Sequence, residues 1–414
     1  MKEGKELKST LQVLPLANMN EDIKVAYMKL ICNFAYNDSN IIRPQEYAEI
    51  IYLMVRVGIE NDASLEIRRY MNNIRDKEEN DDLIKYLSLN LPECIYEILK
   101  KSIMKDMLYI KRVKEREGIC SYKYTKEIQE KLDIQDSEVE VILSAITNDE
   151  DIIKLRMNDS QIKNSIKELV VQAGAVGVPM AAIYFSGSVV GLSTAGIITG
   201  LEVLGLGGIL GFSSMATGIG ALFIMGFATY KGLRKVTNVD DFENSKQREL
   251  ILQDIIKNYH QSLTYLIEDI NEVTRLIDIE VQKYNKSLQK IEKLTTSMSI
   301  LSKSAQLTIN KINSATKEIL ISKIPKKLDR VRLEELTLEP TKIKLRENIL
   351  ECYDLHEIYG TNNEVIKAEY ILNTSLSFNK LEQLLSSFDI LGYNNIKDAA
   401  IAQVKGFAKG LVNK

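Results

Sequence analysis

The feature that most constrains this chain is one long stretch that is almost free of charge. Between Leu169 and Tyr230 the only charged side chain is Glu202, although 27% of all residues are charged. A helix needs about 20 apolar residues to cross a bilayer, so the stretch is long enough for two crossings, and three also fit. Globular cores do not usually take so many apolar residues from one run. We therefore expect a membrane hairpin within residues 156–240.

Glycine is concentrated in the same stretch, which holds most of the chain's 21 glycines. Glycine destabilises a helix in water by about 1 kcal/mol, but in lipid it allows two helices to approach closely. This packing uses small residues four positions apart, and the stretch offers three such glycine pairs: Gly187 and Gly191, Gly196 and Gly200, and Gly207 and Gly211. The glycine spacing therefore favours paired helices in a membrane.

Positive charges flank the stretch on both sides, with Lys163 and Lys167 before it and Lys231, Arg234 and Lys235 after it. Cytoplasmic flanks are enriched in Lys and Arg, so both ends are expected in the cytoplasm and the number of spans is expected to be even. We expect the spans near Leu169–Val190 and Ile209–Tyr230. Glu202 would then lie at the tip between them, where its ionisation costs least.

Two other states of the stretch remain open. In the first, a soluble form keeps the hairpin buried and inserts it on a trigger; this arrangement resembles the architecture of α-helical pore-forming toxins of the haemolysin type. In the second, the stretch is a permanent part of a soluble core. The first ten residues, MKEGKELKST, lack the apolar run of a secretory signal. We therefore expect any insertion to use the internal stretch.

The composition outside the stretch predicts an all-α fold. The chain has six prolines, none of them between Met180 and Ile324, and aromatic residues make up 7% of it. Such a composition favours long helices over sheets. We expect four parts: a helical domain over residues 1–155, the hairpin over 156–240, long coiled-coil helices over 241–324 and a C-terminal helical region over 325–414.

The coiled-coil prediction depends on apolar residues that recur at heptad spacing. The seam consists of Leu252, Ile256, Leu263, Leu266, Ile270, Val273 and Ile277. Such a seam packs against another helix, either of this chain, of a second copy or of a protein partner. The register slips near Glu280, where we expect the helix to continue. A bend is expected at Thr295–Ser297, followed by a further helix that folds back.

The sequence of the N-terminal domain predicts two similar helical halves. Ala35 and Asp38 follow the first helix, Pro44 marks the start of the next and Glu46 lies in its first turn. In the second half, Glu117 and Gly118 form a charged turn after a long apolar-periodic helix.

These two stretches resemble the TerB-like family, the tellurite-resistance type of α-helical domain, over about residues 20–155. The resemblance implies a sensing or recruitment module of bacterial stress responses, including phage defence, and hence a bacterial inner membrane with both terminal regions in the cytoplasm. It also implies a divalent-cation site at Asp38, Glu46 and Glu117, since hard cations bind carboxylate oxygens. Alternatively, these acids cap helix N-termini.

Motifs for catalysis are missing from the sequence. The two histidines, His260 and His356, have no His partner at metal-ligand spacing, and no phosphate-binding GxxxxGK run occurs. The net charge of −3 gives no support for nucleic-acid binding. The four cysteines are scattered, as is typical of free thiols in a reducing compartment. We therefore expect a non-enzymatic protein whose partners are a lipid bilayer and other proteins.

Overall fold

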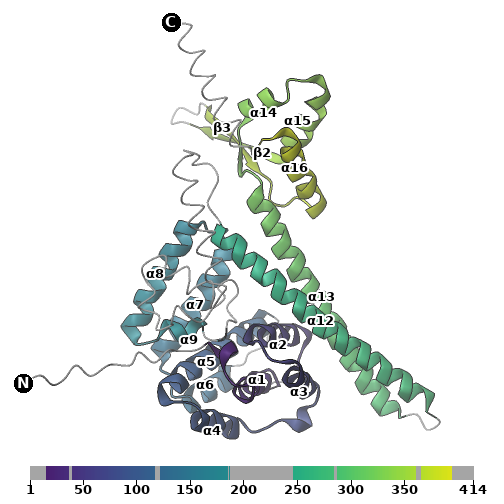
Figure 1. The fold of residues 1–414 in the computed structure, drawn as a ribbon. Helices are drawn as coiled ribbons and strands as arrows, with labels where there is room; N and C mark the ends of the chain where they lie inside the picture. The colour runs from purple at the N-terminus through teal and green to yellow at the C-terminus, as the bar shows by residue number, and fades with distance from the viewer. Residues whose placement is uncertain are drawn as a thin grey trace, which may run out of the picture. The chain divides into compact units, whose positions relative to one another are not determined.

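The computed structural model describes residues 15–36, 40–116, 122–184, 186, 246–283, 287–359 and 365–393. Most of these residues are helical (Figure 1), which confirms the all-α class in its coarse form. The chain divides into two compact units. The first comprises Met1–Phe227 with Ser245–Asn313, and the second comprises Ala228–Asn244 with Ser314–Lys414.

The first unit begins with a short 3-10 turn, Leu16–Asn18, followed by a bundle of helices around α1. The bundle consists of α1 (Glu21–Tyr36), α2 (Pro44–Val57), α3 (Asn61–Asn72), α4 (Asn80–Asn90), α5 (Glu93–Arg116), α6 (Tyr122–Lys131), α7 (Asp136–Lys154) and α8 (Asp159–Val176). Helix α1 contacts α2, α3, α4 and α5, and most of its side chains are buried. A helix that is apolar nearly all round is stable only when neighbours cover it on several sides.

The start of α2 confirms the helix start predicted at Pro44. Pro44 is its first residue and Arg43 its N-cap, and the Arg43 backbone N–H donates to Glu46 Oε2 over 3.1 Å. The helix ends at Gly58, whose φ of 66° lies in the left-handed region that favours glycine.

Two long helices follow the apolar stretch: α12 (Lys246–Gln282) and α13 (Leu288–Lys323) (Figure 1). They are antiparallel, because Lys290 at the start of α13 pairs with Glu280 at the end of α12, while Lys311 lies over the ring of Tyr259 further back. The predicted continuation of the helix past Glu280 is therefore wrong. Glu280 accepts hydrogen bonds from Lys283 and the Ser287 backbone, and these contacts organise the turn.

Helix α13 runs without interruption through Thr295–Ser297 to Lys323, so the separate folded-back helix predicted after these residues is wrong. The hydroxyl of Thr295 donates to the carbonyl of Ile291 over 2.9 Å, and that of Thr296 donates to Glu292 over 3.0 Å. Both bonds run one turn back along the same helix, so these polar side chains are satisfied without a break in α13.

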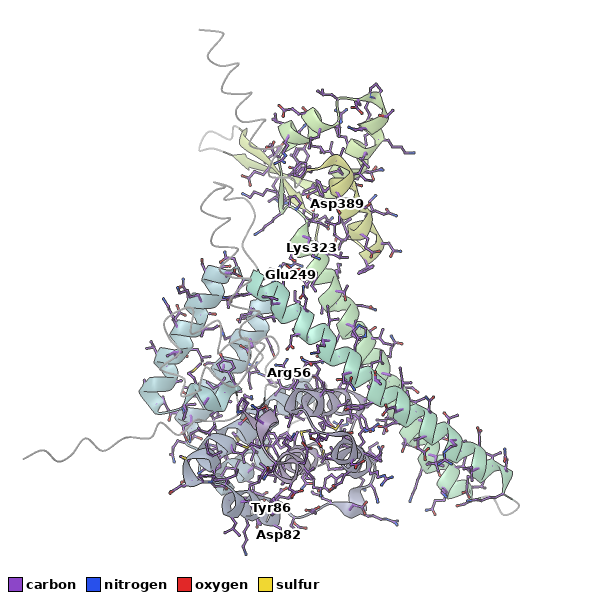
Figure 2. All side chains as sticks on the ribbon, viewed as in Figure 1. Arg56, Asp82, Tyr86, Glu249, Lys323 and Asp389 are labelled. Atoms are coloured by element: carbon purple, nitrogen blue, oxygen red, sulfur yellow. The ribbon has the colours of Figure 1, made fainter. Side chains whose placement is uncertain are left out.

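Helix α12 packs against α2 and α8 of the bundle. Arg56 of α2 donates to Asp254 over 3.0 Å, close to where α2 meets α12 (Figure 2). The rings of Tyr52 and Tyr259 lie against each other beside this pair, tilted by 31° with centroids 4.1 Å apart. Helix α13 docks too, since Ser304 donates to the Pro44 carbonyl over 2.9 Å.

The predicted seam is thus used within the chain. Leu252 and Leu266 are buried, while the remaining seam residues are half-buried: Ile256, Leu263, Ile270, Val273 and Ile277. Further along, Arg68 of α3 pairs with Asp269 over 2.7 Å.

The second unit is a small mixed fold beyond Asn313. It contains α14 (Arg330–Leu336), a 3-10 turn (Pro340–Lys342), α15 (Ile343–Leu350), α16 (Phe378–Leu391) and the antiparallel strands β1 (Lys327–Leu328), β2 (Tyr353–Tyr359) and β3 (Val365–Leu372). The strand order is β1-β3-β2, and His356 lies opposite Glu369. The purely helical expectation for residues 325–414 is therefore wrong. Aromatic and β-branched residues such as Tyr353 and Ile371 favour strands.

Leu266 provides a direct test of how α12 docks, because its neighbour Ile267 is 47% exposed whereas Leu266 is fully buried. We expect Leu266→Ala to lower the free energy of unfolding by about 2–5 kcal/mol through lost burial and a residual cavity. Ile267→Ala is the matched control and should change it by less than about 1 kcal/mol. Urea unfolding of the full chain measures both, and equal effects would contradict this docking.

Asp269 should make stability depend on pH. Burial, opposed by the Arg68 guanidinium, raises the pKa of Asp269 to about 6. Between about pH 4 and pH 6 the carboxyl of Asp269 is therefore protonated in the folded chain but ionised in the unfolded chain. Protonated Asp269 contributes its full stabilisation below about pH 4, and this contribution is lost as the pH rises to 6. Asp269→Asn keeps the neutral form at every pH.

We expect the difference in unfolding free energy between wild type and Asp269→Asn to change by about 2–3 kcal/mol from pH 4 to pH 7. The exposed Asp278 of the same helix provides the control variant Asp278→Asn. Parallel pH profiles of wild type and Asp269→Asn would refute the assignment.

Candidate functional site

The beginning of the apolar stretch, residues 169–184, is folded against protein. Helix α8 ends at Gly177, whose φ of 82° is left-handed, and α9 (Met180–Tyr184) begins after Pro179. Leu169 is 3% exposed and all of α9 is buried. The predicted span Leu169–Val190 is therefore wrong as a single helix, because Gly177 and Pro179 break it. Across the described ranges, no helix has the length and apolarity needed to cross a bilayer.

A buried lysine holds the end of α9. Lys105 of α5 is 0% exposed, and its ammonium donates to the Ile183 carbonyl over 2.7 Å and to Ser186 Oγ over 2.9 Å. Helix α9 has only five residues, so its last carbonyls need partners from elsewhere in the fold. A cation at a helix C-terminus also interacts favourably with the negative end of the helix dipole.

Asp106 completes the charge balance beside this lysine. Its carboxylate lies 3.3 Å from the Lys105 ammonium and accepts a hydrogen bond from the Tyr27 hydroxyl of α1 over 2.5 Å. The Tyr27 hydroxyl also lies 3.2 Å from Ser102 Oγ. All four residues are at most 1% exposed, so their partners must come from the protein.

Asp149 of α7 is the least satisfied member of this group. It is 2% exposed, and within the described residues neither of its carboxylate oxygens accepts a hydrogen bond. Burial raises the pKa of Asp149 well above its usual range, against the opposing charges of Lys105 and Arg56. Burial likewise lowers the pKa of Lys105, which Asp106 opposes. We call Tyr27, Ser102, Lys105, Asp106 and Asp149 the buried polar cluster.

The buried polar cluster holds the last described residues of the apolar stretch. The ammonium of Lys105 binds the backbone at Ile183 and the side chain at Ser186, immediately before Gly187. All five side chains of the cluster are buried, and the contacts described here position α9 and balance charge.

Sequence reasoning missed this cluster, although a signal for it exists. Ser102 and Asp106 continue the apolar stripe of α5 formed by Ile95, Leu99 and Val113, all of which are buried. Polar residues on the buried face of a helix require internal partners, so Ser102 and Asp106 on this stripe indicate a buried polar contact.

Most of the predicted site residues lie outside the described residues. These are Asp38 and Glu117 of the cation site, and Gly187, Gly191, Gly196, Gly200, Glu202, Gly207, Gly211 and Tyr230 of the hairpin. Glu46 is described: it is 1% exposed and closes the capping box of α2, the alternative role expected for these acids. The described part of the chain contains no group of three potential metal ligands. His260 and His356 are both exposed.

Comparison with known proteins gives no relative: no protein-family model, curated protein or solved structure matches this chain.

Replacing Lys105 tests the buried polar cluster. We expect Lys105→Met to lower the free energy of unfolding by about 3 kcal/mol, because Asp106 is left buried without its cation. The amide hydrogens of α9 should also exchange faster, since Ile183 loses its partner. Lys85→Met, an exposed site on α4, is the control and should have little effect. Unchanged exchange in α9 would show that Lys105 does not hold this helix.

Proposed function

We propose that the chain is a non-enzymatic membrane protein of bacteria, whose helical body stays in the cytoplasm while residues 187–230 enter the inner membrane. The observation that carries this proposal is the nearly uncharged sequence from Leu169 to Tyr230, with Glu202 as its single charge. Because Leu169–Tyr184 packs against protein, the bilayer segment starts later than the sequence suggested. Residues 187–230 are still long enough for two crossings of about 20 residues each, but Glu202 then lies within the first crossing and not at the tip between the two.

The ends of this segment support an even number of crossings. Ser186, before the proposed membrane segment, is bound to Lys105, and Gln247, after it, donates its backbone N–H to Asp159 of α8 over 3.0 Å, so both flanks contact the same helical body. If that body stays on one side of a membrane, the intervening chain must cross an even number of times. The lysines and arginines on both flanks favour the cytoplasmic side for the body.

The biological role in this proposal comes from the TerB-like resemblance. Such a domain would sense a stress, or recruit a protein partner, in a stress response or in phage defence. The half-buried seam residues of α12 offer a surface for self-association or for a partner. The divalent cation at Asp38, Glu46 and Glu117 stays a prediction of the same resemblance.

A second candidate is a pore-forming effector that exposes the segment only on a trigger. The observation that favours it is the buried polar cluster, because Asp149 is buried without a hydrogen-bond partner in the described part of the fold. A buried unsatisfied carboxylate lowers the stability of the state that contains it. The docked state of α9 would then be metastable, and its release would expose apolar surface.

Arginines in the second expected span test membrane insertion. We expect Leu222→Arg with Ile224→Arg to move the chain out of the membrane fraction, since each arginine costs about 2.5–3.5 kcal/mol at the bilayer centre. The matched control Leu222→Ile with Ile224→Leu should remain in it. Flotation of cell membranes, followed by extraction at alkaline pH, measures the bound fraction.

The same experiment separates the two candidates. Resistance of the wild-type chain to alkaline extraction supports permanent insertion. Recovery of the wild-type chain as a soluble protein without detergent contradicts permanent insertion. In that case, release of dye from liposomes tests the pore-forming alternative, with the double arginine variant as the inactive control.

A further inference from the structure

A cleft of about 610 Å³ lies between the bundle and α13 within the first unit. One wall is formed by the loop before α2 and by the end of α3, including Asn40, Asn72 and Arg75. The opposite wall is the first part of α13, with Lys293 and Ser297 among its residues. Ligand pockets for small molecules span about 300–1,000 Å³, so a compact metabolite fits this space.

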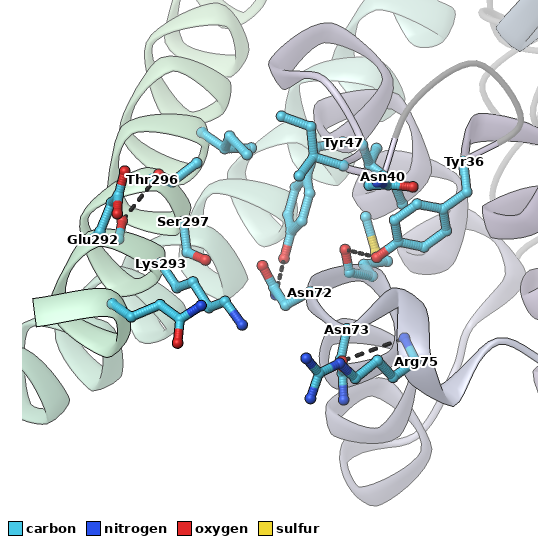
Figure 3. A pocket seen from close by; sticks show the side chains of 15 residues that line it. Tyr36, Asn40, Tyr47, Asn72, Asn73, Arg75, Glu292, Lys293, Thr296 and Ser297 are labelled. Atoms are coloured by element: carbon cyan, nitrogen blue, oxygen red, sulfur yellow. Dashed lines mark hydrogen bonds between the residues drawn. The ribbon is translucent and has the colours of Figure 1, made fainter. Parts of the chain in front are cut away.

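Two cations face each other across this cleft. Figure 3 shows that Lys293 reaches from α13 toward the wall that carries Asn72 and Arg75. Neither the Lys293 ammonium nor the Arg75 guanidinium forms an ion pair or a side-chain hydrogen bond with another described residue. Ser297 lies one turn from Lys293 on the same face and points its hydroxyl into the space (Figure 3). Arginine, lysine and a hydroxyl are donors suited to a phosphate group.

Acceptors and an apolar floor complete the lining. The amide nitrogen of Asn72 donates to Tyr47 over 3.0 Å and to the Arg68 carbonyl over 2.8 Å, which leaves its amide oxygen for a ligand. Glu292 adds a carboxylate on the α13 wall. Such acceptors match hydroxyl or amino groups. The floor includes the buried side chains of Tyr47 and Met71, which suit the less polar body of a ligand.

We infer that this cleft binds a small phosphate ester, of about the size of a nucleoside monophosphate or a sugar phosphate. Arg75, Lys293 and Ser297 hold the phosphate, while Asn72 and Glu292 accept hydrogen bonds from the hydroxyl or amino groups of the ester. Because the ligand joins the bundle to α13, its binding stabilises the docked position of the long helices.

Binding to the full-length chain tests this inference with four probes: inorganic phosphate, adenosine monophosphate, glucose 6-phosphate and adenosine. We expect saturation-transfer NMR and calorimetry to detect inorganic phosphate at millimolar concentration, and at least one of the two esters to bind more tightly. Adenosine, which lacks the phosphate, should bind at least tenfold more weakly than its monophosphate. The ester that gains affinity distinguishes a nucleotide from a sugar phosphate.

Variants locate the binding. Arg75→Gln and Lys293→Gln should each weaken ester binding at least tenfold. The controls Arg69→Gln on α3 and Lys303→Gln on α13 remove exposed charges outside the cleft and should leave binding within twofold. Both cleft side chains are exposed, so the variants should fold, and a thermal melt checks this. No binding of any phosphate probe, no gain for either ester, or equal losses in the control variants would each overturn the inference.

Discussion

The attachment of α9 to α5 is the interaction on which the rest of the arrangement depends. It places the beginning of an extremely apolar sequence inside a water-excluded helical body, and it does so with a buried ammonium ion rather than with apolar contacts alone. Lys105 binds the backbone at Ile183 and the side chain of Ser186. Helix α12 docks on the same body, where the backbone N–H of Gln247 donates to Asp159 of α8.

Helices α12 and α13 contact the bundle through charged pairs as well as through apolar side chains. Arg56 with Asp254, Arg68 with Asp269 and Lys311 with Glu49 join the two long helices to α2 and α3. Burying an ion pair carries a desolvation penalty that offsets much of its attraction, so such pairs are weak evidence of high stability. Each ion pair forms only when α12 lies at one position along the bundle, so the pairs favour one register of this helix.

Local signals in the sequence predicted the parts of the fold that local physics controls. Pro44 predicted the start of α2, because proline fits the first turn of a helix. The periodicity of α12 predicted the burial of Leu252 and Leu266. The end of α12 at Gln282 was missed because a heptad pattern considers only apolar residues. Glu280 forms ion pairs with Lys283 and Lys290, and the pattern does not include these contacts. Strands β2 and β3, which are adjacent in sequence and pair with each other, were missed although residues such as Tyr353 and Ile371 favour strands.

The candidate site was less predictable for a related reason. The apolar stretch was evident from composition, but how its beginning folds depends on Gly177, Pro179 and the distant Lys105 together. A polar residue on an apolar stripe has many possible hydrogen-bond partners elsewhere in the sequence. Only the structure shows which of these partners it contacts. The cleft beside α13 likewise combines Arg75 and Lys293, which lie on separate elements of the first unit.

The adjacent rings of Tyr52 and Tyr259 have a practical consequence for studying this protein. The chain contains no tryptophan, so its near-ultraviolet absorption and emission come mainly from its 19 tyrosines. Two of these rings lie 4.1 Å apart, one on α2 and the other on α12. Close aromatic rings in a fixed orientation couple optically and give a circular-dichroism band that disappears when they separate. The protein therefore carries a native optical reporter of whether its long helix is docked.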